Sequence, residues 1–193
     1  MNNKILLAGV GGQGVLFAHQ LLADCALAQG LDVTGAETHG MSQRGGSVVS
    51  HLKIGDGIAP LIRQGTADWI LAFDAAEAYR NLAFIRCGGT IVVNTQSVPN
   101  NFPAAPVSQQ LEKFNVALRV LDADGIARNL GRASVANVAL LGLASTCVGF
   151  PLARAALRET LARATRPQFL ELNLQAFDEG ANKASDFFNE DKL

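Results

Sequence analysis

Short apolar runs alternate with amphipathic stretches along most of the chain. Residues 4–8 form an apolar run that ends in glycines, which predicts a buried strand. Residues 15–29 carry apolar side chains at helical spacing, and Gly30 is placed to stop the predicted helix. Residues 31–36 predict a second strand. The segment is therefore expected to form a βαβ unit whose two strands run parallel.

A different pattern follows in residues 47–54, where side chains alternate between two faces and predict a half-buried strand. Val48, Leu52 and Ile54 share one of these faces with Ser50. The Gly-Asp-Gly sequence that follows is a tight-turn signal. It predicts a hairpin with a return strand over residues 58–62, at a sheet edge because of Pro60.

Strands and helices continue to alternate through the middle of the chain. Buried strands are predicted at residues 69–73, 90–94 and 116–121, the second of them after a turn at Gly88-Gly89. Helices are predicted at residues 75–86 with Asp74 as cap, at 108–114, after Asp122 or Asp124, and at 135–147, 152–165 and 168–188, with a loop at 97–106. The expected fold is α/β: a three-layer sandwich around a mostly parallel sheet, with a Rossmann-like start, a hairpin and a helical C-terminus, in a single domain over residues 1–193.

Composition narrows the class of protein. Charged residues make up 17% of the 193 residues, against about 25% in an average soluble domain. Two explanations are compatible with this and with each other: the strands and helices are buried on all sides, as in an α/β sandwich, or partner subunits cover part of the surface. The net charge of −1 favours neither nucleic acid nor an acidic membrane. No signal peptide is recognisable and no apolar run approaches the ~20 residues that span a bilayer, so a cytoplasmic location is expected.

The chain has three cysteines, Cys25, Cys87 and Cys147, and no pair of them has the C-x-x-C spacing of a metal or cluster site. Each lies in an apolar stretch, which predicts buried and inert thiols. No metal and no iron–sulfur cluster is expected on this chain.

The first glycine block satisfies G-x-G-x-x-G through Gly9, Gly11 and Gly14, directly after a predicted strand and before a helix. Such glycines form a tight turn and let the backbone approach a phosphate, while the helix N-terminus offers free N–H groups. Three interpretations stay open: a phosphate-bearing ligand other than NAD, a structural turn, and NAD or FAD. Glu37 is a candidate ribose ligand, but it leads into a loop and a hairpin rather than a second Rossmann half.

The second glycine block occupies the loop that follows the second predicted strand. Arg44 offers a planar fork of donors, and Gly45 and Gly46 let backbone N–H groups come close to an anion. The loop also contains His39, Ser42 and Gln43. An anion site and a solvated loop whose arginine pairs with a carboxylate are both compatible with these residues.

Together these blocks, GVGGQG at residues 9–14 and ETHGMSQRGGSVV at residues 37–49, resemble the gamma-type domain of 2-oxoacid:ferredoxin (acceptor) oxidoreductases. The H-G-M-S-Q-R-G-G form is most similar to the beta subunit of indolepyruvate ferredoxin oxidoreductases. Residues 137–142 (NVALLG) and 173–180 (NLQAFDEG) resemble two later motifs of the family, so the resemblance covers nearly the whole chain.

The resemblance implies a subunit, inactive alone, of an enzyme that converts a 2-oxoacid and coenzyme A to acyl-CoA and CO2 and passes electrons to ferredoxin. Thiamine diphosphate and [4Fe-4S] clusters are expected in partner subunits, and the isolated chain could pair as a homodimer. A polar cleft is expected to face coenzyme A phosphates or a partner's thiamine site. Its residues are Gly9, Gly11, Gly12, Gln13, Gly14, Ser42, Gln43, Arg44, Gly45 and Gly46.

Two side chains near this cleft have open roles. His39 could assist proton transfer or contact a 2-oxoacid carboxylate, although a histidine without a visible partner is commonly structural. Asn137 could cap a helix or reach the cleft. The competing functions are a stand-alone NAD- or FAD-binding oxidoreductase and a stand-alone nucleotide- or coenzyme A-binding protein. The identity of the 2-oxoacid stays open, with the indolepyruvate-like motif favouring aryl pyruvates.

Overall fold

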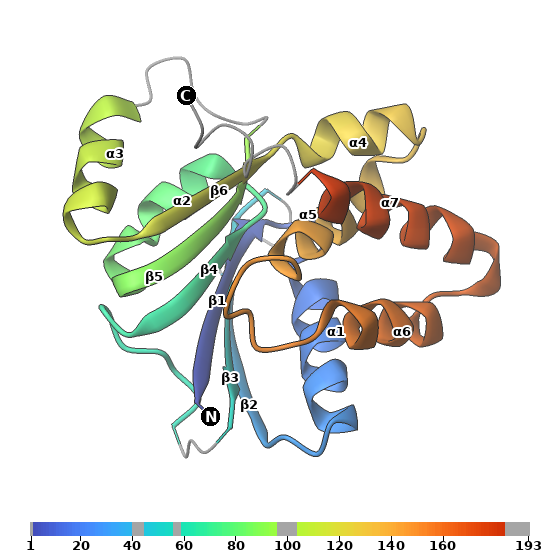
Figure 1. Ribbon diagram of the computed structural model, residues 1–193, viewed down its shortest axis with the longest axis horizontal. Coiled ribbons are helices and arrows are strands. Elements are labelled where there is room, and N and C mark those ends of the chain that lie inside the picture. Colours follow the sequence, from blue (N-terminus) through green and yellow to red (C-terminus); the bar gives the residue numbers. More distant parts are fainter. Residues whose placement is uncertain (1, 40–44, 56–58, 96–103, 184–193) are drawn as a thin grey trace.

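A computed structural model describes residues 2–39, 45–55, 59–95 and 104–183. Their core is a six-stranded sheet in the order β2-β3-β1-β4-β5-β6 (Figure 1). The strands are β1 (Asn3–Val10), β2 (Val33–His39), β3 (Ser47–Ile54), β4 (Ala67–Ala72), β5 (Ile85–Asn94) and β6 (Ala117–Leu121). The helices are α1 (Val15–Ala28), α2 (Ala75–Arg80), α3 (Ala104–Lys113), α4 (Ala123–Asn129), α5 (Ala136–Ala144), α6 (Arg154–Ala164) and α7 (Leu170–Asn182).

Helices cover both faces of the sheet, which confirms the three-layer α/β prediction. Helices α2 and α3 lie on one face, and α1, α5, α6 and α7 lie on the other (Figure 1). The larger apolar core forms under the second group, where Leu7, Leu71 and Phe177 are fully buried. The smaller core forms under α2 and α3 around Leu6 and Ile70. Because adjacent strand residues feed opposite cores, the parallel strands are apolar on both faces, as expected for this architecture.

The sheet is parallel from β1 through β4 and β5 to β6, but β3 runs antiparallel to both of its neighbours, β1 and β2. The expected βαβ unit is therefore corrected in one respect: β1 and β2 point the same way but are separated by β3. After β2 the chain turns back as β3 and does not enter a second βαβ unit. The sequence had indicated this absence of a second Rossmann half. This is a departure from a dinucleotide-binding fold.

The predicted hairpin partner of β3 is wrong, since β3 pairs with β2 and residues 59–62 form no strand. Pro60 has no backbone N–H to donate to a neighbouring strand. The N–H of Ile62 donates to Nδ1 of His51 at 3.2 Å instead. The face assignment within β3 is confirmed, because Leu52 and Ile54 enter the larger core while Val49 packs on the smaller one.

Several predicted boundaries move for local reasons. Gly88 and Gly89 lie inside β5, where Gly88 has a φ of 70°. Strand β5 slips its register against β4 between Ala67 and Trp69, so these glycines accompany a bulge rather than a turn. The predicted helix over residues 75–86 ends at Arg80 and is followed by a 3-10 turn, and α3 begins at Ala104, inside the predicted loop.

Helices α5 and α7 pack with almost no space between their backbones. A Cβ atom at Gly142 would lie 2.0 Å from the carbonyl oxygen of Phe177, and one at Gly180 would lie 1.9 Å from that of Ala139. Both glycines belong to the later motifs of the resemblance, NVALLG and NLQAFDEG. Their role in this fold is close helix–helix contact.

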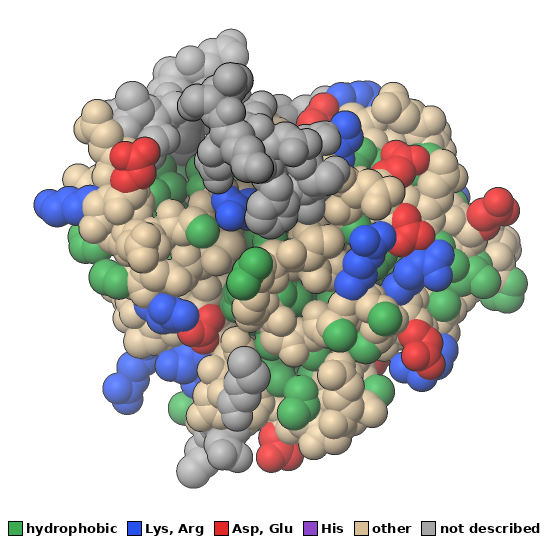
Figure 2. Space-filling model, viewed as in Figure 1, with side chains coloured by type: hydrophobic (Ala, Val, Ile, Leu, Met, Phe, Trp, Pro, Cys, Tyr) green, Lys and Arg blue, Asp and Glu red, His purple; other side chains and the backbone are tan. Residues whose placement is uncertain are grey.

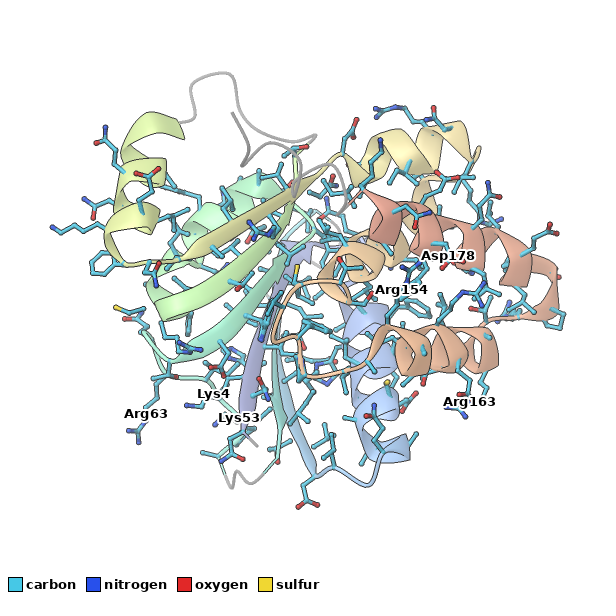
Figure 3. All side chains as sticks on the ribbon, in the orientation of Figure 1. Lys4, Lys53, Arg63, Arg154, Arg163 and Asp178 are labelled. Carbon is cyan, nitrogen blue, oxygen red and sulfur yellow. The ribbon has the colours of Figure 1, made fainter. Side chains whose placement is uncertain are left out.

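The outer surface of α6 and α7 carries interspersed charges (Figure 2). Arg154 pairs with Asp178 at 3.2 Å (Figure 3). Arg158 pairs with the same carboxylate at 3.0 Å. Partial burial of the carboxylate acts against ionisation, but hydrogen bonds from the two guanidinium groups lower the pKa of Asp178 overall. The pairs are half exposed, so each contributes little to stability.

Two histidines make the fold sensitive to acid. His19 Nδ1 lies 2.6 Å from Oγ of Ser50, and burial lowers its pKa below 6.5 although Glu37 opposes the shift. Burial and then the charge of Lys53 lower the pKa of His51 in the same direction. The folded state therefore disfavours protonation of both imidazoles, whereas the unfolded chain takes up these protons near pH 6.5.

Stability is therefore expected to be highest above pH 6.5 and to fall as the pH drops below it. The loss is about 1.4 kcal/mol for each pKa unit between the folded and unfolded values. Urea unfolding at about pH 7.5 and pH 5.5 measures the difference. His51→Gln should flatten this dependence, and an equally steep dependence in that variant would contradict the assignment.

Candidate functional site

The two glycine blocks meet at the carboxyl end of β1. Strand β1 pairs with β3 up to Val10 and Ser47, and immediately beyond this pair the N–H of Gly11 donates to the carbonyl oxygen of Gly46 at 2.9 Å. Segments more than thirty residues apart in sequence thus form one junction. The described members of the predicted group are Gly9, Gly11, Gly12, Gln13, Gly14, Gly45 and Gly46. The bond between Gly11 and Gly46 joins the two blocks.

The other predicted members of the site are not all placed. Ser42, Gln43 and Arg44 lie outside the described residues. His39 is the last residue of β2, where its backbone pairs with that of Val48.

The turn over residues 9–14 is closed by the side chain of Gln13. The Oε1 atom of Gln13 accepts from the backbone N–H of Val10 at 2.8 Å, and the backbone N–H of Gln13 donates to the carbonyl oxygen of Val10. Gly9 has no room for a side chain, since a Cβ would lie 2.8 Å from Val15. Gly14 starts α1 at a φ of 80° and supplies no side-chain cap. The first N–H groups of α1 are therefore available to an anion.

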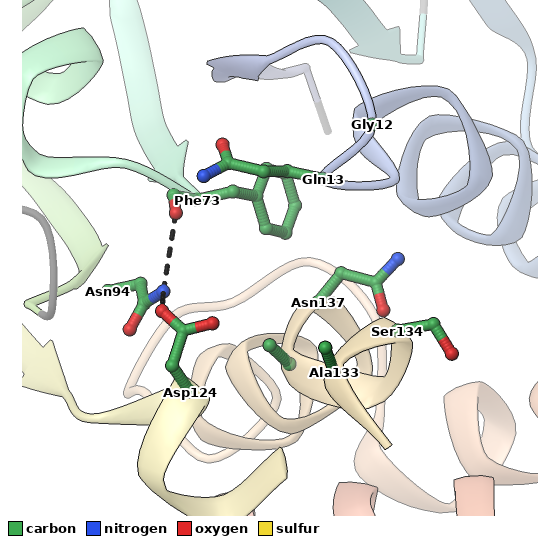
Figure 4. Close-up of a pocket in the computed structure, with 9 residues that line it drawn as sticks. Gly12, Gln13, Phe73, Asn94, Asp124, Ala133, Ser134 and Asn137 are labelled. Atoms are coloured by element: carbon green, nitrogen blue, oxygen red, sulfur yellow. Dashed lines mark hydrogen bonds between the residues drawn. The ribbon is translucent and has the colours of Figure 1, made fainter. Parts of the chain in front are cut away.

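A cavity of about 370 Å³ opens beside this turn, at the carboxyl edge of the parallel strands (Figure 4). It lies between the ends of β1 and β4, whose following helices, α1 and α2, cover opposite faces of the sheet (Figure 1). In open α/β sheets this switch point is the usual place for a ligand. The lining residues are Gly12, Gln13, Phe73, Asn94, Asp124, Ala133, Ser134, Ala136 and Asn137.

Asn94 and Asp124 form one wall of the cavity. Asn94 is 4% exposed and donates from Nδ2 to Asp124 Oδ2 at 2.6 Å and to the Phe73 carbonyl at 3.3 Å (Figure 4). Its Oδ1 accepts from the N–H of Ala123 at 3.1 Å. One amide side chain thus ties together the ends of β4 and β5 and the start of α4.

Asn137 forms the opposite wall, from the second position of α5. It is 7% exposed, its Oδ1 accepts from the N–H of Val138 at 2.8 Å, and its Nδ2 lies 3.4 Å from the Gly14 carbonyl oxygen. The helix has Val135 as its N-cap residue without a side-chain cap. Of the two roles that the sequence left open for Asn137, reaching the cleft is the one observed.

Sequence reasoning missed Phe73, Asn94, Asp124 and Ser134 as members of the site. A signal was present for two of them: Asn94 ends a predicted strand, and Asp124 follows closely after another. Polar residues at the carboxyl ends of parallel strands gather at one edge of the sheet.

A buried carboxylate on α2 holds Ser47, the last residue of the second glycine block. Glu77, on α2, is 1% exposed, and Ser47 Oγ donates to its Oε2 at 2.6 Å. Its Oε1 accepts from Arg80, whose side chain is 65% exposed. Asp74 caps the same helix, as predicted, by accepting from the N–H groups of Ala76 and Glu77.

Glu77→Ala is expected to destabilise the protein by about 1–3 kcal/mol, because it removes the acceptor of both the half-buried Ser47 hydroxyl and Arg80. Ser47→Ala is the matched variant, because it removes the first of these contacts and leaves a buried carboxylate oxygen without its donor, so a loss of about 1–3 kcal/mol is expected there as well. Urea unfolding of both variants measures the difference. A loss in Glu77→Ala with none in Ser47→Ala would show that the pair with Arg80, and not the anchoring of Ser47, is what Glu77 contributes.

The cysteine prediction holds only in part. Cys25 is buried and Cys147 is partly buried, and burial raises the pKa of both thiols. Cys87 is exposed near the start of β5, so its predicted burial is wrong. Within the described ranges, no three His, Cys, Asp or Glu side chains come together as a metal site requires. In the same ranges, no helix has the length and apolar character needed to cross a membrane.

Comparison with known proteins agrees with the glycine-block resemblance. The chain is 33% identical to indolepyruvate oxidoreductase subunit IorB of Pyrococcus horikoshii, covering 96% of this chain and 98% of that one. It is 34% identical to IorB of Archaeoglobus fulgidus, over 95% and 96% of the two chains. The fold matches the gamma subunit of a keto/oxoacid ferredoxin oxidoreductase from Geobacter sulfurreducens with a TM-score of 0.73 and 24% identity, over 95% and 99% of the chains.

The profile of a protein family described as pyruvate ferredoxin/flavodoxin oxidoreductase matches residues 4–183. This range contains both glycine blocks, the cavity and the packed pair of helices α5 and α7. The chain therefore belongs to the pyruvate ferredoxin/flavodoxin oxidoreductase family.

Proposed function

We propose that this chain, as a single gamma-type domain over residues 1–193, is one subunit of a cytoplasmic, multi-subunit 2-oxoacid:ferredoxin oxidoreductase. The enzyme would convert an indolepyruvate-like 2-oxoacid and coenzyme A to acyl-CoA and CO2. The observation that carries the proposal is the end-to-end similarity to IorB subunits. Thiamine diphosphate and [4Fe-4S] clusters would be held by partner subunits, and the isolated chain would be inactive.

Exposed apolar side chains beside the glycine junction support a partner subunit at this place. Leu16 and Phe17 lie in the first turn of α1 and are 43% and 38% exposed. Burial of a large exposed apolar side chain by another chain is energetically favourable. In the absence of partners, the same surface could pair two copies of this chain.

The glycine junction is the proposed site for coenzyme A phosphates. It combines the open N-terminus of α1 with the loop that carries Ser42, Gln43 and Arg44, and Arg44 would be the main anchor. The adjoining cavity is a poorer place for phosphate where Asp124 lines it, because Asp124 is the one charged side chain among the described lining residues. Two negative charges 5 Å apart near a protein surface repel each other by about 3 kcal/mol.

Arg44→Ala is expected to raise the KM for coenzyme A tenfold to a hundredfold in the assembled enzyme, which corresponds to the loss of about 1.5–3 kcal/mol from a charge-assisted contact. The KM for the 2-oxoacid should stay unchanged. Arg63→Ala is the control, because Arg63 is exposed in the segment that leads into the amino end of β4, at the opposite edge of the sheet (Figure 3). An unchanged KM for coenzyme A in Arg44→Ala would remove Arg44 from this role.

The function is tested by recovering the tagged chain from its native cells under anaerobic conditions. Mass spectrometry identifies the proteins that come with it, and dye reduction measures 2-oxoacid- and coenzyme A-dependent activity. Recovery of a thiamine-binding subunit with activity toward aryl pyruvates would support the proposal. Recovery of an inactive chain by itself would instead favour a stand-alone nucleotide- or coenzyme A-binding protein.

A further inference from the structure

A second cavity, of about 490 Å³, opens at the amino edge of the parallel strands, at the opposite end of the sheet from the glycine junction. This amino-edge cavity lies between the C-terminal end of α3 and the first residues of β5 (Figure 1). Packed cores leave few voids larger than a water molecule, so the opening has room for an inserted apolar group. Most of its apolar lining residues belong to the smaller core or pack against it. These apolar residues are Leu82, Ile85, Val107, Leu111, Phe114 and Val116.

Apolar surface continues outward from the amino-edge cavity. Phe114 lines the cavity and is nevertheless 49% exposed. Leu118, on β6, is 39% exposed and lies on the same face of the sheet as Val120, which packs on the smaller core. A small ligand held inside the cavity leaves this surface exposed, whereas a polypeptide segment lying across the opening covers it.

A cation is held in place beside the amino-edge cavity. Arg86 lies between the lining residues Ile85 and Cys87, and its side chain is 46% exposed. Its Nε donates to Asp68 Oδ1 at 2.6 Å, and its Nη1 donates to the carbonyl oxygen of Cys87 at 2.8 Å. A guanidinium has five N–H donors, so others remain for an acceptor from outside. An arginine that is already positioned loses little side-chain entropy when it binds a carboxylate.

The exposed charges on α3 differ in their distance from the cavity. The lining residues 107, 110, 111 and 114 recur at helical spacing and therefore share one face of the helix. Helical spacing places Glu112 about 150° around α3 from the middle of that face. Lys113 lies nearer to it and is exposed next to Phe114. The side of α3 at the cavity is thus the more positive one.

We propose that the amino-edge cavity is the docking point for a segment of a partner subunit. The segment inserts an apolar side chain into the cavity and places a neighbouring Asp or Glu carboxylate on Arg86. The inference rests on the proposed function, since it requires an enzyme of several subunits. Aromatic and arginine side chains dominate the binding energy of protein interfaces, and Phe114 and Arg86 supply one of each.

Cys87 is a built-in reporter for this contact, because its exposed thiol lines the amino-edge cavity. The isolated chain and the anaerobically purified complex are treated with the same maleimide, and mass spectrometry measures the labelling rate of each cysteine. Cys87 is expected to lose most of its reactivity in the complex, because thiol labelling requires access. Cys25 and Cys147 are shielded within the fold and should label slowly in both samples, which makes them the internal controls.

Two results of the labelling would overturn the inference while leaving the proposed function intact. One is equal reactivity of Cys87 in the isolated chain and in the active complex. The other is protection of Cys87 in the dilute isolated chain, which would assign the cavity to a small molecule or to a second copy of this chain. Recovery of no partner subunit would instead overturn the proposed function, and this inference with it.

Phe114→Ser and Arg86→Gln provide a second test that does not depend on Cys87. Each is expected to weaken association with the rest of the complex by about tenfold or more. Glu112→Gln is the matched control on the far side of α3 and should assemble like the wild type. Competition with the wild-type chain during assembly measures the loss, and thermal unfolding of the isolated variants verifies that they are folded. A folded Phe114→Ser chain that competes as well as the wild type would overturn the inference.

Discussion

Replacing Gly142 with alanine is expected to destabilise the protein by about 3 kcal/mol, at the upper end of the cost of overpacking. The added Cβ would lie 2.0 Å from the Phe177 carbonyl oxygen and 2.9 Å from its carbon, both of them backbone atoms of α7. Backbone in a packed helix cannot move aside as a flexible side chain does. Gly180→Ala should have an equal effect from the other helix, because its Cβ would meet the Ala139 carbonyl at 1.9 Å.

Helix propensity alone predicts the opposite sign, since alanine is favoured over glycine in a helix by about 1 kcal/mol. Ala155→Gly, at an exposed position of α6, measures the difference in helix propensity by itself. It should lower the free energy of unfolding by about 1 kcal/mol. Urea unfolding of Gly142→Ala, Gly180→Ala and Ala155→Gly separates the cost of overpacking from the effect of helix propensity. If Gly142→Ala proved more stable than the wild type, α5 and α7 would not be in backbone contact.

The second large effect is expected at Gly14, where the backbone of the glycine turn meets the wall of the cavity. Gly14 has a φ of 80°, and a Cβ there would lie 2.0 Å from Nδ2 of Asn137. Alanine in this conformation costs about 1–2 kcal/mol. Displacing the buried amide of Asn137 adds about 1–3 kcal/mol. Gly14→Ala is therefore expected to lose about 3 kcal/mol of stability.

Gly12→Ala is the matched control for this variant. Gly12 has a φ of 105°, but no atom lies within 4 Å of a Cβ built on it. The substitution therefore carries the backbone strain without the contact, and its expected cost is about 1–2 kcal/mol. The double variant Gly14→Ala, Asn137→Ala should be more stable than the sum of the single changes predicts, because the colliding amide is gone. Strict additivity would show that Gly14 and Asn137 are not in contact.

Local pattern was sufficient for most elements of this fold. Apolar runs and helical spacing placed β1, α1 and β4 within a few residues, and Asp74 and Asp122 cap the helices that they were expected to begin. These features depend on neighbours in sequence: a capping side chain binds N–H groups two or three residues ahead of it, and a strand's alternation follows from its own pleat. The glycine blocks were recognisable for the same reason.

The partner of each strand depended on tertiary structure. Residues 47–54 have a strand's alternation whichever strand lies beside them, and the pattern does not say that β3 pairs with both β1 and β2. This insertion brings Gly46 to Gly11 and Ser47 to Glu77. The contacts of the second glycine block with the first are therefore a consequence of sheet order.

The cavity likewise belongs to no single segment of the sequence. Its walls come from the glycine turn, the ends of β4 and β5, and the starts of α4 and α5, which parallel strands deliver to one edge of the sheet. Asn137 makes the point most directly, since it lies 123 residues from Gly14 and contacts its carbonyl oxygen. The sequence by itself determined most of the elements, the glycine blocks and the family. Only the tertiary structure decided which polar side chains face one another, because that depends on strand order and helix packing across the whole chain.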